Sequence, residues 1–321
     1  MALSRRRRRK GHVQGVMSIF TEISVSAGVF LGLGAAFCQS LSYLFSRRFV
    51  RGVFENAGIL LVLSHGAMAL FSVVLLPFFW PQRWPPISAY ILPLMGTSIS
   101  YLVGQAGLFL ALRSADASRV SPLLGLKIII LALICAGLLG RDYFWMQWVA
   151  VGLSVLAAAL LNRFGGRLPW QSLLWVLLAC GGYALSDLSI PPLVEKFSAE
   201  GLMRASVFAT CISYILCGVV MLPFLPLLPL CRASAWLDAV PFSLAWFAAM
   251  LLLYACFSTI GVVYGNIVQS SRGVISILIR AAVAARGWEH LETKVSRVVI
   301  LQRVAAAVLL SAAIALFHLG S

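Results

Sequence analysis

Long apolar runs, separated by short polar turns, dominate the chain. A helix that crosses a bilayer needs about 20 apolar residues in a row, whereas barrel strands alternate apolar and polar positions. The runs here are continuous, so we expect membrane-spanning helices. The ten predicted helices cover approximately residues 25–45, 57–79, 87–112, 118–140, 145–161, 170–194, 205–225, 242–268, 273–285 and 298–319.

Composition leads to the same fold class. Of the 321 residues, 61% are hydrophobic and 11% are charged, whereas a soluble domain carries about 25% charged residues. In lipid, every backbone polar group must find its partner within the protein, which leaves helices or closed barrels. We therefore predict an all-α integral membrane protein with about ten transmembrane helices.

A polar link at 162–169 divides the predicted helices five and five. We interpret residues 25–161 and 170–319 as two repeats that follow a basic tail at 1–24. Because each repeat has an odd number of helices, the second must enter the membrane in the opposite orientation. Such inverted repeats are typical of secondary transporters, with the substrate site near the middle of the membrane.

An ungapped shift of 153 residues supports the duplication. It places Tyr101 on Tyr254 and Lys127 on Arg280. It also places the last predicted helix of the first half on that of the second. These matches predict that equivalent positions of the two halves approach one site.

The formal net charge is +15, from 25 basic and 10 acidic residues, and six of the basic residues form the run 5–10. Nucleic-acid binding needs a solvated basic face, whereas most basic residues here lie in short loops and in the tail. Membrane topology and anionic lipid explain them better, so we expect no nucleic-acid partner. We expect a multi-pass inner-membrane protein with both termini in the cytoplasm, although Arg47, Arg48 and Arg51 argue against that orientation.

The seven cysteines are irregularly spaced and lie mostly in apolar runs, as small core residues do. No paired carboxylates, nucleophile motif, phosphate loop or zinc spacing is present in the sequence. We therefore expect no enzymatic activity, no metal and no cofactor.

The stretch 111–161 carries a family pattern. A short link leads into an apolar helix that ends at Leu139-Gly140, and Gln147-Trp148 with Gly152 opens the next helix. This pattern resembles the drug/metabolite transporter superfamily, in particular its ten-helix EamA-type members. One departure is Arg141, where the family usually has glutamate. The resemblance implies a transporter fold and an export role, but it implies no substrate.

Lys127 is the first candidate site residue, because it falls near the middle of the helix predicted over 118–140. A charge at that depth is costly if it faces lipid, so the side chain should face a wet cavity or a partner. One interpretation is a fixed positive charge that attracts an anionic substrate. The other is a lysine held by helix carbonyls or by a carboxylate.

Asp187 is the one carboxylate well inside a predicted span, and Tyr183 shares its helix face. Asp187 could couple transport to protons. It could also be the counter-ion of Lys127 or Arg280. We favour the counter-ion, because an unpaired buried charge is expensive.

Other polar side chains in the spans are weaker candidates. Arg280, the repeat equivalent of Lys127, lies either in the cavity or at the membrane interface. Two pairs spaced four residues apart each share a helix face, and they serve either as cavity lining or as ordinary interhelical hydrogen bonds. These pairs are Tyr101 with Gln105 and Tyr254 with Ser258. His65 and Asn266 are candidates of the same kind.

The leading functional prediction is a secondary transporter, by resemblance an exporter, that moves a small polar metabolite by alternating access. The positive charge in the predicted core favours an anion or zwitterion, such as an amino acid or organic acid. The alternative is a lipid-linked or lipid-translocating membrane protein. The implied partners are a small-molecule substrate and the lipid bilayer, and a homodimer is left open.

Overall fold

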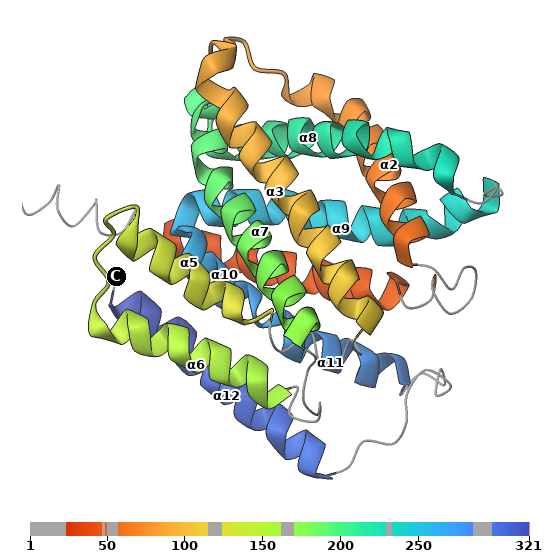
Figure 1. The fold of residues 1–321 in the computed structure, drawn as a ribbon. Coiled ribbons are helices and arrows are strands. Elements are labelled where there is room, and N and C mark those ends of the chain that lie inside the picture. The colour runs from red at the N-terminus through yellow and green to blue at the C-terminus, as the bar shows by residue number, and fades with distance from the viewer. Residues whose placement is uncertain are drawn as a thin grey trace, which may run out of the picture.

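The structure is a computed structural model that describes residues 24–46, 49, 57–114, 124–161, 170–228, 233–284 and 297–320. Within these residues the regular elements are helices, and no strand occurs (Figure 1). The first helix is Ser24–Ser46. The later α-helices are α2 (Ala57–Leu75), α3 (Ile87–Ser114), α5 (Leu126–Gly137), α6 (Trp145–Leu161), α7 (Trp170–Glu195), α8 (Leu202–Met221), α9 (Ala233–Ile260), α10 (Val262–Gln269), α11 (Arg272–Ala284) and α12 (Arg297–Leu319).

Six helical segments of the described chain are long and apolar enough to cross a membrane. They are Ser24–Ser46, Gly58–Phe79, Ile87–Leu108, Trp170–Glu195, Leu202–Pro226 and Ser234–Ile260. Three shorter apolar helices accompany them, at Leu126–Gly137, Trp145–Ala157 and Ala305–Leu319. The predicted fold class, an all-α membrane protein, is confirmed.

Two predicted helices were wrong in their bounds. The start of the helix predicted over 118–140 lies outside the described residues, and in the described part Leu124 and Gly125 form a turn before α5 begins at Leu126, since glycine disfavours helix. The helix predicted over 242–268 begins earlier, at Ala233, and is broken at Gly261. Gly261 has φ +81° and ψ 161°, a conformation that essentially only glycine adopts, so α9 ends there and α10 begins.

The helices pack in pairs that join the two halves of the chain. Helix α3 runs beside α7, α2 packs against α8, and α6 packs along α12 (Figure 1). The first helix packs against α9, where Gly34 faces Leu252. The contacts are reciprocal, because the second and fifth helices of each half meet their equivalents and the first of each meets the third of the other.

Glycine allows the close approach of α3 and α7. A Cβ atom on Gly182 would lie 2.7 Å from the Gly104 nitrogen and 2.7 Å from the Ser100 carbonyl oxygen. A Cβ atom on the neighbouring Gly181 would meet nothing within 4 Å. Small residues let membrane helices approach in this way, and here Gly182 alone of the pair does so.

Candidate functional site

A cavity of about 300 Å³ lies between the helices, and both halves of the chain contribute to its lining. The first helix, α2 and α3 contribute from the first half, together with the start of α5. Helices α7, α8 and α9 and the region around the start of α11 contribute from the second. Its charged and amide side chains are Gln39, Gln105, Lys127, Asp187, Gln269 and Arg272.

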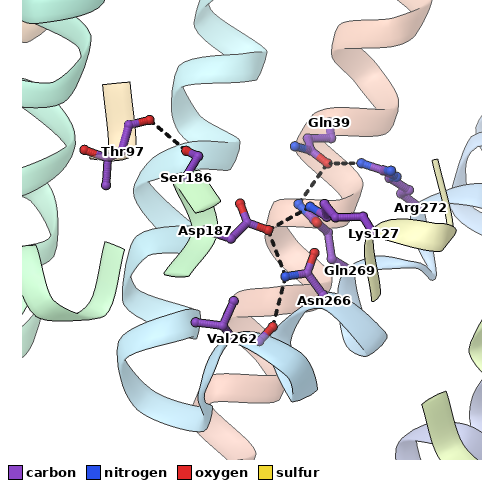
Figure 2. A network of polar contacts seen from close by, with 9 residues as sticks. All are labelled: Gln39, Thr97, Lys127, Ser186, Asp187, Val262, Asn266, Gln269 and Arg272. Carbon is purple, nitrogen blue, oxygen red and sulfur yellow. Dashed lines mark hydrogen bonds and ion pairs between the residues drawn. The ribbon is translucent and has the colours of Figure 1, made fainter. Parts of the chain in front are cut away.

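An ion pair connects α5 and α7 at this cavity. The Nζ atom of Lys127 lies 2.7 Å from Oδ2 of Asp187, and the two side chains are only 13% and 10% exposed. Asn266 on α10 donates from Nδ2 to the same oxygen at 2.9 Å (Figure 2). The amide also donates to the Val262 carbonyl at 2.9 Å, which holds it in place. Asp187 is thus a carboxylate with two donors on one oxygen.

The position of Lys127 in its helix corrects the prediction. Lys127 is the second residue of α5, in the first turn, and not in the middle of a helix. The structure nevertheless pairs it with Asp187. Of the two interpretations of Lys127, contact with a carboxylate is the one that the geometry shows.

A second network joins the first helix to α10 and α11. The Oε1 atom of Gln39 accepts from Gln269 Nε2 at 3.1 Å and from Arg272 Nη1 at 3.2 Å (Figure 2). Ser40 Oγ donates to the Arg272 carbonyl at 3.0 Å. Each of these contacts joins residues more than 200 positions apart in the chain.

The cavity carries an excess of positive charge. Lys127 is neutralised by Asp187, while no carboxylate in the described chain lies within ion-pair distance of Arg272. The guanidinium is held instead by the neutral amide of Gln39. An anionic group in the cavity would therefore meet one uncompensated cation, which has N–H donors to spare.

Aromatic rings form much of the remaining lining. The rings of His65 and Tyr101 lie 5.7 Å apart between centroids, and those of Tyr101 and Tyr183 lie 6.2 Å apart. Gln105 donates from Nε2 to the Tyr101 hydroxyl at 2.9 Å, so the predicted pair on α3 does share a face. Trp246 on α9 donates from Nε1 to the hydroxyl of Tyr214 on α8 at 2.9 Å.

Most of the predicted site residues meet at this cavity. The lining includes Tyr101, Gln105, Lys127, Tyr183, Asp187 and Tyr254, and also the weaker candidate His65. Asn266 reaches Asp187. Among the described residues, Ser258 is not part of the lining, and the side chain of Arg280 on α11 lies outside what the structure describes.

Several lining residues were not among the site candidates predicted from the sequence. They are Gln39, Tyr43, Tyr214, Trp246, Gln269 and Arg272. A signal was present for the amides, because Gln39 and Gln269 are buried polar groups next to or within apolar runs, and such groups mark functional paths in membrane proteins. The aromatic residues carried no signal that separates a cavity wall from an ordinary core.

Comparisons with known proteins agree with the fold. Residues 26–163 match a family described as the EamA-like transporter family. Among 28 solved chains that match, one, described only as a crystal structure of a protein, has a TM-score of 0.67 and 13% identity over 92% of this chain and 97% of that chain. Comparison with the curated proteins found no match. At this identity the structural likeness establishes the fold alone.

Proposed function

We propose, from the EamA-like transporter family domain at residues 26–163, that this protein moves a small organic anion or zwitterion by alternating access. A domain of this family implies a secondary transporter in a membrane and a small-molecule substrate, and it specifies no substrate. The class of substrate is inferred from the cavity.

The charge of the cavity carries this inference. Arg272 lines it without a carboxylate partner in the described chain, while Lys127 and Asp187 neutralise each other. Charged groups in a membrane interior usually pair with one another or mark a substrate path. An anionic substrate group would supply the missing counter-charge, and a cationic substrate would be repelled.

The size of the cavity limits the substrate. Its volume is about 300 Å³. This is the lower end of the range for ligand pockets. An amino acid or a small organic acid fits such a space, whereas a phospholipid with two acyl chains is several times larger. The volume therefore favours solute transport over the lipid-linked alternative.

The division of the lining between the two halves supports alternating access. Side chains of both halves of the chain line one cavity, and the helix contacts between the halves are reciprocal. We propose that residues 25–161 and 170–319 are inverted repeats that rock about this cavity and expose it to one side of the membrane at a time. Export is the direction that the family resemblance suggests.

Uptake by reconstituted proteoliposomes tests the proposal. Labelled small anions, zwitterions and cations would be compared in the wild type, in Arg272→Gln and in Arg204→Gln. Arg204 is the matched control, since it pairs at 3.5 Å with Glu200 and its side chain is 48% exposed. We expect saturable uptake of anions or zwitterions by the wild type and the control. Hydrogen bonds to charged groups contribute about 1.5–3 kcal/mol, so Arg272→Gln should lower uptake roughly 10- to 100-fold.

The contrary result is equally clear. If folded wild-type protein takes up none of the three classes in a saturable way, the solute-transporter proposal is wrong. Transfer of labelled anionic lipid between the leaflets of the same vesicles would then support the lipid-translocating alternative.

A further inference from the structure

We propose that the transported anion carries an aromatic ring with an O–H or N–H group, and that His65 accepts a hydrogen bond from that group. This inference rests on the proposed function and narrows its substrate class. Both the charged and the aromatic side chains of the cavity lining support this inference.

Six of the aromatic side chains that line the cavity form a group of four rings and a pair of rings, and the hydrogen bond from Trp246 to Tyr214 connects the pair to the group. They are Tyr43, His65, Tyr101, Tyr183, Tyr214 and Trp246. Their ring centroids lie 5.7–6.3 Å apart in the pairs that join them, and tilted or edge-on contacts dominate. Aromatic pairs at such distances and angles are favourable. A flat aromatic ring that enters this cluster would make contacts of the same kind.

His65 adds a directed polar group to the cluster. Its Nδ1 atom lies 2.8 Å from the Leu61 carbonyl oxygen, which can only accept, so Nδ1 carries the proton. In the neutral ring, Nε2 is then an acceptor. Nε2 has no hydrogen-bond partner in the described chain, and His65 is only 1% exposed. An unpaired buried acceptor is costly, and a donor on the substrate that reached Nε2 would satisfy it.

The charged part of the lining decides the sign of the substrate. Aromatic rings by themselves also attract cations, so the cluster alone would fit an aromatic amine. However, the carboxylate of Asp187 already holds Lys127 at 2.7 Å and the Asn266 amide at 2.9 Å. Arg272 adds a positive charge, and one nitrogen of its guanidinium, Nη1, donates to the Gln39 side chain. The remaining guanidinium donors suit a carboxylate.

The combined chemistry points to a carboxylic acid on a hydroxyaryl or indole-like ring. The carboxylate binds on the Arg272 side, the ring lies among the tyrosines, and its O–H or N–H donates to His65 Nε2. A cavity of about 300 Å³ limits the molecule to one ring system with a short acid chain.

Two probes of similar size test the donor. Uptake of labelled 4-hydroxyphenylacetate and 4-fluorophenylacetate would be measured with the full-length reconstituted protein, because fluorine removes the donor with little change in shape. One neutral hydrogen bond corresponds to a roughly tenfold lower half-saturation concentration for the hydroxy acid. In His65→Phe, which keeps a ring but lacks Nε2, the two acids should become equal.

The control and the contrary results separate this inference from the proposed function. His318→Phe makes the same substitution at a histidine that stacks on Tyr264, outside the cavity lining, and should keep the tenfold difference. Equal uptake of both acids by the wild type overturns the inference even if His65→Phe does not fold. Saturable uptake of aliphatic anions alone overturns it while the proposed function stands. Uptake of no anion or zwitterion overturns both.

Discussion

Asp187 shows how one buried carboxylate positions two neighbours. Its Oδ2 atom receives both Lys127 Nζ and Asn266 Nδ2, so α5, α7 and α10 meet at a single oxygen. A pair buried to this degree stabilises a protein weakly overall, yet removal of one partner leaves an uncompensated charge. Substitution of one partner at this site should therefore lower the stability of the fold, so a loss of transport in such a variant would not by itself show a role in transport.

This asymmetry predicts a non-additive pair of variants. Lys127→Ala alone should lower the free energy of unfolding by about 3–5 kcal/mol, because Asp187 loses its counter-ion. Lys127→Ala combined with Asp187→Ala should recover most of that loss, since no unpaired charge remains. Thermal or denaturant unfolding in detergent measures both. A double variant less stable than the single one would contradict the pairing.

Arg272 allows the charge of the cavity to be changed without a change of shape. Gln39→Glu places a carboxylate beside the guanidinium that the amide oxygen now contacts at 3.2 Å. The cavity then loses its positive excess, so anion uptake should fall at least tenfold, the scale of a hydrogen bond to a charged group, while the protein stays folded. Gln147→Glu is the matched control, because Gln147 caps the Phe144 amide outside the cavity lining. Undiminished uptake by Gln39→Glu would remove Arg272 from the site.

At the scale of elements, the close contact of α3 with α7 depends on glycines, and Gly182 is one of them. Gly181 and Gly182 are neighbours on α7, but only Gly182 faces α3, where backbone atoms leave no space for a methyl group. The two positions therefore separate helix packing from helix propensity, which is the same for both.

Alanine substitutions at the two glycines should have opposite effects. Gly182→Ala should destabilise the protein by about 1–3 kcal/mol, the usual penalty for overpacking. Gly181→Ala should be neutral or stabilise it by up to about 1 kcal/mol, because alanine favours helix over glycine. Melting temperatures in one detergent compare them. Equal melting temperatures would mean that α3 and α7 are farther apart than the structure shows.

At the scale of the whole molecule, the number of crossings in each half decides on which side of the membrane the link and the C-terminus lie. The reciprocal contacts of α2 with α8 and of α6 with α12 fit two repeats of five helices. If each half crosses the membrane an odd number of times, the link at 162–169 and the C-terminus lie on opposite sides.

Single cysteines test this arrangement in the full-length chain. With the seven native cysteines replaced, Gly166→Cys should react with an impermeant maleimide on intact cells. Ser321→Cys should react only after the membrane is permeabilised, because the termini are expected to be cytoplasmic. Labelling of both positions from the same side would rule out five crossings per half. Labelling with the two sides reversed would keep the repeats and invert the orientation.

Much of the fold follows from the sequence alone. The bounds of α6 agree with the prediction, and those of α7, α11 and α12 agree within one residue. Lipid requires each backbone group to be paired within its own helix, so the apolar run that determines each helix is local in sequence. Polar residues inside such runs, such as Asp187 and Tyr101, could also be identified as candidates, because the run around each of them is local in sequence.

Only the tertiary structure decided which of those polar residues meet. Gln39 contacts Arg272, which lies 233 positions later in the chain. The sequence around either residue does not indicate that the two side chains meet. Ser258 shares a helix face with Tyr254, yet it lies outside the cavity wall of the described chain, because it is one turn farther along α9, close to the end of that helix at Ile260. The sequence determined where the helices form, because a lipid solvent requires apolar runs whose backbone groups are paired within each helix. Packing between helices of both halves determined which residues form the site.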